Sequence, residues 1–206
     1  MSSWEMDVIT FRAARPADLE GVGRVHVETW RQAYRGVVPS SFLARMDPAM
    51  SAERFRKRLS DPKQAFWVAL AGEDVVGFAS GGPNRLADFE ADAEIYTLYV
   101  CPSWQGRGIG RRLVGQLADW FKQQGHQSVA VVTFRANPWR RFYERLGGRI
   151  AGEKTFEVDG VALPEVVYCW SDVEELRERA KRGALRGEID SCVPLGPCGR
   201  SRGNSG

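Results

Sequence analysis

The sequence predicts a single α/β domain in which helices cover both faces of a mixed sheet. Two observations support this fold class: apolar runs of strand character alternate with amphipathic segments, and short turns join several of the strands. The predicted order is strand, two helices, three strands, helix, strand, helix and two strands. A length of 206 residues is enough for one domain with an appended tail.

The first half of the chain supplies most of the predicted strands. Pro16 opens the first helix, because proline is tolerated in a first turn, and the turn 36–39 ends it. A second helix is expected over 51–59. The turn 71–74 joins two strands and predicts that they pair antiparallel. The strands expected in this half are 8–12, 65–70, 75–80 and 93–101.

The second half alternates helix and strand before a final hairpin. A helix is expected over 111–124, and the apolar run 128–134 is typical of a strand covered on both faces. Asn137 followed by Pro138 predicts the start of the next helix, with Asn as its cap. The last two strands are expected on either side of an Asp-Gly turn: 149–158 and 163–170.

The C-terminal segment differs in composition from the rest of the chain. We expect residues 1–171 to form the domain and residues 172–206 to lie outside it. This segment begins with a charged helix that reaches about Arg182. Residues 183–206 are rich in Gly, Ser and Arg without apolar periodicity, which predicts disorder.

Composition excludes several function classes. The net charge of +3 is small, so we expect no nucleic-acid partner. No apolar run approaches the ~20 residues of a membrane span, and we expect a cytoplasmic protein without a membrane partner. Cys101 and Cys169 are expected to be reduced and buried. Cys192 and Cys198 do not have the spacing of a zinc pair, and with two histidines in the chain we expect no metal site.

The segment 99–112 carries the strongest functional signal. A helix begins within it, and the free N–H groups of a helix N-terminus attract anions. Glycines allow a ligand to approach the backbone because they carry no Cβ. The segment holds three glycines at alternate positions and three arginines: Gly106, Gly108, Gly110, Arg107, Arg111 and Arg112. It therefore predicts a site for a phosphorylated cofactor.

Two common phosphate-binding motifs fit this segment poorly. A Walker A loop requires Gly-Lys-Ser/Thr, whereas the chain reads Gly110-Arg111-Arg112. A dinucleotide fingerprint requires Gly-x-Gly-x-x-Gly and an acid about 20 residues later. Here the spacing is Gly-x-Gly-x-Gly, and the next strand ends at Phe134-Arg135.

The loop 105–110, Gln-Gly-Arg-Gly-Ile-Gly, resembles the Gln/Arg-x-x-Gly-x-Gly/Ala loop of the GNAT superfamily of N-acetyltransferases. In that superfamily the loop binds the pyrophosphate of acetyl-CoA. Three other segments are similar to the same family, so that the resemblance covers about residues 8–170: 25–36, 94–100 and 137–147. It implies a GNAT-like, mostly antiparallel sheet and an acetyl-CoA site.

The resemblance also implies which residues bind acetyl-CoA. Backbone groups of Leu98 and Val100 would bind the pantetheine arm where their strand diverges from its neighbour. Asn137 would donate a hydrogen bond to the cofactor, although its role as a helix cap accounts for it equally well. The residues implied on the cofactor side are Leu98, Tyr99, Val100, Gln105, Gly106, Arg107, Gly108, Ile109, Gly110, Arg111, Asn137 and Tyr143.

Two residues are candidates for catalysis. Tyr143 would protonate the departing CoA thiolate, since a phenol pKa of ~10 is close to a thiol pKa of ~8.5. The alternative is an aromatic core residue at helical spacing from Leu146. Glu94 would accept the proton that the amine must lose, and period-two counting places it on the strand face of Leu98. The alternative is a solvated carboxylate at the start of a strand.

The acceptor side is less defined by the sequence. His26, Trp30 and Tyr34 share one helix face, which is either core or part of an acceptor pocket. Four acids within 88–94 favour a cationic acceptor, against the alternative that they form a solvated face.

The function predicted is transfer of acetyl from acetyl-CoA to a primary amine, by direct attack in a ternary complex and without a metal. The amine belongs to a small molecule or to a peptide or protein. A non-catalytic acyl-CoA-binding or sensor module is the alternative. The sequence leaves open the identity of the acceptor, the oligomeric state, for which a homodimer is one possibility, and the role of the tail.

Overall fold

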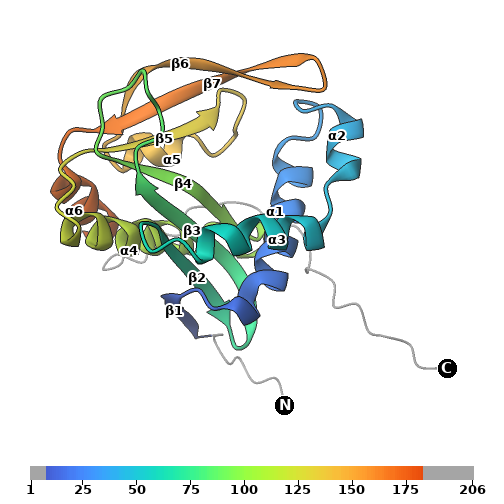
Figure 1. The fold of residues 1–206 in the computed structure, drawn as a ribbon, viewed down its shortest axis with the longest axis horizontal. Helices are drawn as coiled ribbons and strands as arrows, with labels where there is room; N and C mark the ends of the chain where they lie inside the picture. Colours follow the sequence, from blue (N-terminus) through green and yellow to red (C-terminus); the bar gives the residue numbers. More distant parts are fainter. Residues whose placement is uncertain (1–7, 183–206) are drawn as a thin grey trace.

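The computed structural model of the protein describes residues 8–182. Within them the chain forms one sheet with helices on both faces (Figure 1). The strands are β1 (Ile9–Ala13), β2 (Ala65–Ala71), β3 (Asp74–Pro83), β4 (Ala93–Val100), β5 (Val129–Phe134), β6 (Arg149–Val158) and β7 (Val161–Trp170). The helices are α1 (Leu19–Ala33), α2 (Ser40–Arg45), α3 (Pro48–Leu59), α4 (Ile109–Gln123), α5 (Arg141–Arg145) and α6 (Val173–Arg182).

The sheet has the strand order β1-β2-β3-β4-β5-β7-β6. Its neighbours pair antiparallel with one exception, because β4 and β5 run parallel. The parallel pair is short: Ala93–Ile95 pair with Val129–Val131, and beyond Ile95 the two strands have no pairing. The predicted mixed, mostly antiparallel sheet is confirmed, and its central seam opens toward the C-terminal end of β4.

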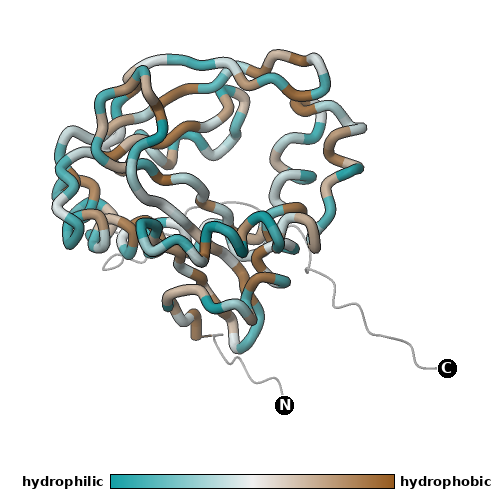
Figure 2. The backbone as a smooth tube through the Cα atoms, viewed as in Figure 1, coloured by the Kyte–Doolittle hydropathy of each residue, from teal (hydrophilic) through white to brown (hydrophobic). Residues whose placement is uncertain are grey.

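Two apolar clusters fix helices to the two faces of the sheet. On one face, Leu113, Leu117 and Phe121 of α4 are fully buried against the strands. On the other, Leu19 of α1 and Phe55 of α3 pack with the inward side chains of β2 and β3. In Figure 2 the apolar residues lie mainly along the strands in the middle of the molecule. This arrangement leaves the ends of β4 and β5 between the two helical layers.

Some helix boundaries differ from those expected. The short helix α2 was not predicted, because six residues give too little periodicity. Helix α3 begins at Pro48 rather than at 51, since Asp47 caps it by accepting the N–H of Met50. The helix expected from Asn137 begins only at Arg141. The N-terminal residues 1–7 and the predicted disordered tail, with Cys192 and Cys198, lie outside the described residues.

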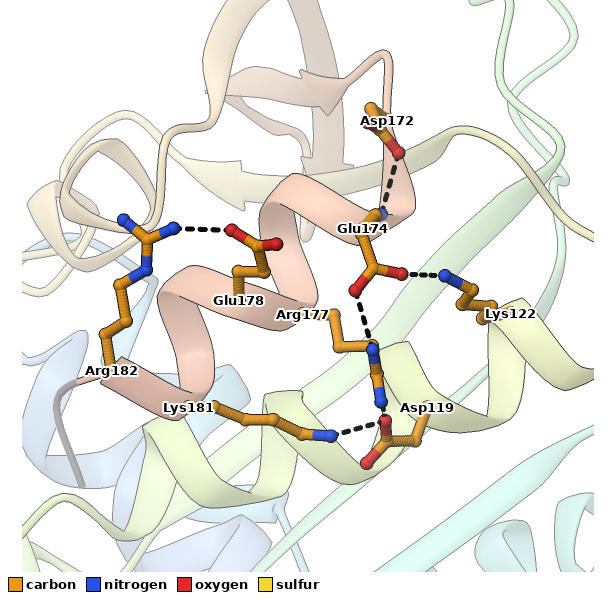
Figure 3. Close-up of polar contacts among 8 residues, drawn as sticks. All are labelled: Asp119, Lys122, Asp172, Glu174, Arg177, Glu178, Lys181 and Arg182. Carbon is orange, nitrogen blue, oxygen red and sulfur yellow. Dashed lines mark hydrogen bonds and ion pairs between the residues drawn. The ribbon is translucent and has the colours of Figure 1, made fainter. Parts of the chain in front are cut away.

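Helix α6 packs against α4 (Figure 3). Leu176 and Ala180 are buried within the core cluster of α4, and Arg177 and Lys181 both contact the carboxylate of Asp119 on α4. Glu174 of α6 forms an ion pair with Lys122 of α4. The domain boundary predicted at residue 171 leaves α6 outside the domain. In the structure, the buried side chains of α6 belong to the same core cluster as those of α4.

Candidate active site

A cavity of about 880 Å³ lies where β4 and β5 diverge. Its wall comes from both helical layers and from the sheet: α1 and α3 on one side, the glycine loop and the start of α4 on the other, with β4, β5, α5 and the β6–β7 hairpin between them. Segments that are distant in sequence therefore meet at one opening of the sheet (Figure 1).

The glycine loop forms one end of the cavity. Gly106 and Gly108 adopt φ angles of +74° and +75°, which only glycine adopts without strain, and both line the cavity. No atom lies within 4 Å of the position that a Cβ on Gly108 would occupy. Helix α4 begins at Ile109, so its first N–H groups lack partners within the helix. This end of the cavity has the donors and the space that a phosphate requires.

The side chains of the loop are held by the protein. Gln105 Nε2 donates to the carbonyl oxygen of Val100 at 3.0 Å, which ties the loop to the end of β4. Arg107 stacks on Trp104 at 4.6 Å from its ring centre and does not line the cavity. Arg111 lines the cavity, and its Nη1 donates to the carbonyl oxygen of Arg179 at 3.0 Å. At this end of the cavity, the groups that can bind an anion are therefore mainly backbone N–H groups.

Strand β4 carries a bulge at Tyr96. Thr97 pairs with Ser80 and Ile95 pairs with Gly81, so Tyr96 has no opposite residue on β3. Side chains alternate between the two faces of a strand, so one extra residue moves the side chains that precede it to the opposite face from the one that simple alternation predicts. Ile95 consequently packs in the same cluster as Leu98.

The bulge corrects one prediction. Glu94 was expected on the face of Leu98, and this is wrong: it lies on the opposite face, near Arg58 of α3 and on the side of Tyr99. Leu98 and Val100 line the cavity beyond the last residue that pairs with β5. Backbone groups there that point away from β3 have no strand partner, as predicted for this part of β4.

Tyr143 on α5 is 7% exposed and lines the cavity. Its ring packs against Phe142, Tyr168 and Trp170. Its hydroxyl makes no hydrogen bond within the described residues, whereas that of Tyr168 contacts both Arg140 and Glu144. Burial raises the pKa of Tyr143 well above the usual phenol value, so the hydroxyl keeps its proton at neutral pH. Tyr143 is both a core aromatic and a protonated group at the cavity wall.

Asn137 lines the cavity and shapes the approach to α5. Its Oδ1 accepts the backbone N–H of Trp139 at 2.9 Å, and its Nδ2 donates to Thr133 Oγ1 at 2.7 Å. The residue therefore caps a turn that precedes α5 rather than the helix itself. Its amide joins the end of β5 to that turn.

His26 and Trp30 of α1, and Tyr34 directly after the helix, line the cavity together. His26 is buried, its Nδ1 lies 3.1 Å from Ser51 Oγ, and burial lowers its pKa to about 4. Trp30 Nε1 donates to the hydroxyl of Tyr99 at 2.9 Å. Tyr34 packs edge-on against Trp30 and Phe134. This set is a packed aromatic wall with a neutral histidine.

Two of the four acids within 88–94 are bound by the protein. Asp92 accepts the backbone N–H groups of Gln127 and Ser128, which holds the start of β5. Glu94, with a side chain 5% exposed, accepts three hydrogen bonds from Arg85 at 2.7–3.1 Å. These two carboxylates therefore provide little unpaired negative charge for a cationic acceptor.

Sequence reasoning missed several residues of the cavity wall. They share no motif, and packing of distant elements brings them to the site: Arg54, Arg58, Arg85, Thr133, Phe134, Lys154, Phe156 and Glu165. Glu165 of β7 is half-buried, and burial raises the pKa of its carboxyl. Arg54 and Arg58 occupy successive turns of α3, a spacing that in the sequence is equally typical of a solvated helix face.

Residues 8–182 contain neither a candidate metal site nor a candidate membrane span. No three His, Cys, Asp or Glu side chains there lie close enough together to hold a metal ion. No helix in that range is long and apolar enough to span a membrane. Cys101 is buried and Cys169 is half-buried, and neither forms a disulfide bond within residues 8–182.

Comparison with known proteins identifies relatives of the chain. The family described as Acetyltransferase (GNAT) family matches residues 27–148. An uncharacterized N-acetyltransferase of Bacillus subtilis, YuaI, is 30% identical over 85% of this chain and 100% of its own length. The N-alpha-acetyltransferase RimI of Mycobacterium tuberculosis is 39% identical over 32% of this chain and 41% of its own.

Solved structures share the fold. YncA of Salmonella typhimurium, a putative acetyltransferase whose structure contains acetyl-CoA, has a TM-score of 0.61. It is 20% identical, over 79% of this chain and 93% of its own.

Proposed function

The chain belongs to the GNAT family of acetyltransferases, and we propose that it transfers an acetyl group from acetyl-CoA to a primary amine by direct attack in a ternary complex. One observation carries the proposal: a single cavity joins the glycine loop, the unpaired backbone of β4 and the hydroxyl of Tyr143. These are the groups that a phosphate, an amide-bearing arm and a departing thiolate require.

Acetyl-CoA would bind along the opening between β4 and β5. The pyrophosphate would accept hydrogen bonds from the first N–H groups of α4, where Gly108 leaves space for its oxygens. The pantetheine amides would pair with backbone groups near Leu98 and Val100, as an added strand pairs with a sheet edge. Asn137 lines the same cavity and would bind the arm beyond the loop.

The amine would attack the thioester carbonyl from the side of α1 and α3. Backbone N–H groups of β4 near Leu98 would stabilise the developing oxyanion, because they are fixed by pairing with β3. Tyr143 would then donate its proton to the departing sulfur. Its hydroxyl suits this role because it keeps its proton at neutral pH and makes no hydrogen bond to the described protein groups.

We propose that a carboxylate of the cavity wall accepts the proton of the ammonium. Glu94 is the first candidate, accepting the proton directly or through water, although both of its carboxylate oxygens contact Arg85. Glu165 is the second, because a raised carboxyl pKa lies closer to that of a base working at neutral pH. Glu94→Gln and Glu165→Gln distinguish them, since loss of the base removes the acidic limb of the pH profile of kcat/KM.

The experiment that tests the function measures CoA release with a panel of amines, amino acids and peptides. Intersecting double-reciprocal plots for acetyl-CoA and amine are expected for direct transfer, whereas parallel plots would indicate an acetyl-enzyme. Binding of acetyl-CoA without transfer to any acceptor would favour a non-catalytic acyl-CoA-binding module. The peptides in the panel test α-amino groups as acceptors, because the relative RimI is named an N-alpha-acetyltransferase.

A further inference from the structure

Three arginines line the cavity on the side of α3, away from the glycine loop. Arg54 and Arg58 come from successive turns of α3, and Arg85 comes from the segment after β3. The guanidinium carbon of Arg58 lies 5.4 Å from the ring centre of Phe55 and 6.0 Å from that of Tyr96. The three guanidinium groups thus gather near the bulge of β4, within the proposed acceptor side.

The arginines differ in what neutralises them. Arg85 forms a two-pronged ion pair with Glu94, the carboxylate nearest to the cluster in this wall. The side chain of Arg58 makes no hydrogen bond and no ion pair within the described residues, and its Nη1 is both buried and unpartnered. Burial and the neighbouring arginines lower the pKa of Arg58. A partly buried guanidinium with an unpartnered buried nitrogen is costly to the fold, which favours a partner supplied from outside.

The phosphates of acetyl-CoA do not explain this charge. The glycine loop follows the C-terminal end of β4, whereas Arg58 lies beside Tyr96 and Arg85 beside Glu94. Tyr96 and Val100 are four residues apart on β4, roughly 13 Å at ~3.3 Å per residue, and Arg85 contacts Glu94, two residues farther from the loop. The arginine cluster and the pyrophosphate cradle therefore occupy different ends of the cavity.

We propose that Arg58, with Arg54 beside it, binds an anionic oxygen group of the acceptor, either a carboxylate or a phosphate. The acceptor is then an amine that carries its own negative charge, such as an amino acid or an aminoalkyl phosphate. This inference rests on the proposed function and narrows its substrate class. It replaces the cationic acceptor that the acids near β4 favoured, because Asp92 and Glu94 are bound by the protein.

The test compares matched acceptors that differ only in charge: an amino acid with its amide, and phosphoethanolamine with ethanolamine. The wild type is expected to prefer the charged member of at least one pair by about tenfold or more in kcat/KM, since a charge-assisted hydrogen bond is being removed. The pair that shows the preference tells a carboxylate from a phosphate. Equal use of the two members in both pairs would overturn the proposal.

The variant Arg58→Gln should abolish the preference, and Arg58→Lys should keep part of it. Arg56→Gln is the matched control, because Arg56 lies on the same helix, is exposed and pairs with Glu53. The melting temperature of Arg58→Gln should equal or exceed that of the wild type, since the variant removes a partly buried charge without an ion-pair partner and loses only its weak ring contacts with Phe55 and Tyr96. Equal losses with charged and neutral acceptors would contradict a role in recognising the anion.

A second readout separates this inference from the proposed function. Inorganic phosphate is titrated into the CoA-saturated protein, in wild type and in Arg58→Gln. Binding that Arg58→Gln abolishes supports the anion site even if no amine is acetylated. Absence of binding to the wild type, or equal binding to both proteins, counts against the site, while the CoA-release panel independently decides the transfer reaction.

Discussion

Replacing Tyr143 by Phe removes one oxygen atom from the wall of the cavity and leaves the ring in place. The ring contacts with Phe142, Tyr168 and Trp170 do not involve the hydroxyl. The hydroxyl makes no hydrogen bond within the described residues, so its loss leaves no buried partner unsatisfied. We therefore expect the free energy of unfolding to change by less than about 1 kcal/mol.

The effect on catalysis should be much larger. A positioned general acid contributes about 10²- to 10⁴-fold to a rate, which corresponds to roughly 3–5 kcal/mol of transition-state stabilisation. We expect kcat of Tyr143→Phe to fall by this factor. The dissociation constant of acetyl-CoA should stay within about threefold of wild type, because the cradle is formed by backbone groups elsewhere.

Tyr168→Phe is the matched control. The hydroxyl of Tyr168 contacts Arg140 at 3.0 Å and Glu144 at 2.8 Å, and the residue does not line the cavity. This variant should lose about 1–2 kcal/mol of stability, or several degrees in Tm, and keep its kcat. Initial rates of CoA release and thermal melts of both variants give the comparison. Unchanged kcat in Tyr143→Phe would refute the assignment of the acid.

Three smaller perturbations test the loop, the buried histidine and the C-terminal helix. Gly108→Ala should raise the Kd of acetyl-CoA about tenfold, because its Cβ would occupy the space proposed for the phosphate oxygens. Gly36→Ala is the control, because Gly36 has φ +78° but does not line the cavity, and this variant should affect stability alone. Equal Kd values for Gly108→Ala and the wild type would contradict the role of the loop. In urea unfolding, stability should decrease as pH falls from 6.5 to about 4, by roughly 3 kcal/mol for His26, because the unfolded chain takes up a proton that buried His26 does not. His26→Gln should flatten this dependence, and identical pH slopes would count against it. Leu176→Ala should cost about 2–5 kcal/mol, since Leu176 is 0% exposed, whereas an unchanged Tm would mean that α6 is not part of the core.

The parts of the site that were predicted correctly have local causes. The sequence predicted a helix directly after the glycine loop from residues adjacent in the chain, although it placed the start at 111 and the helix begins at Ile109. The divergence of β4 from β5 was expected only through the family resemblance. Local patterns and one resemblance were thus enough to predict the fold and to propose an acetyl-CoA site at this opening of the sheet.

The parts that were missed depend on contacts between distant elements. The bulge at Tyr96 arises from the pairing of β4 with β3, and no residue in β4 marks it, so simple alternation placed Glu94 on the wrong face. Arg58 reaches β4 because α3 packs across the sheet, which helical periodicity does not reveal. The charged appearance of α6 concealed a stripe of Val173, Leu176 and Ala180 that completes the core.

The central claim is that the cavity at the opening of the sheet is an acetyl-CoA site. Isothermal titration of the purified protein with acetyl-CoA tests it most directly, since it requires no knowledge of the acceptor. We expect one molecule of acetyl-CoA to bind per chain, with binding weakened in Gly108→Ala and retained in Tyr143→Phe. Absence of acetyl-CoA binding to the folded wild-type protein would contradict the account.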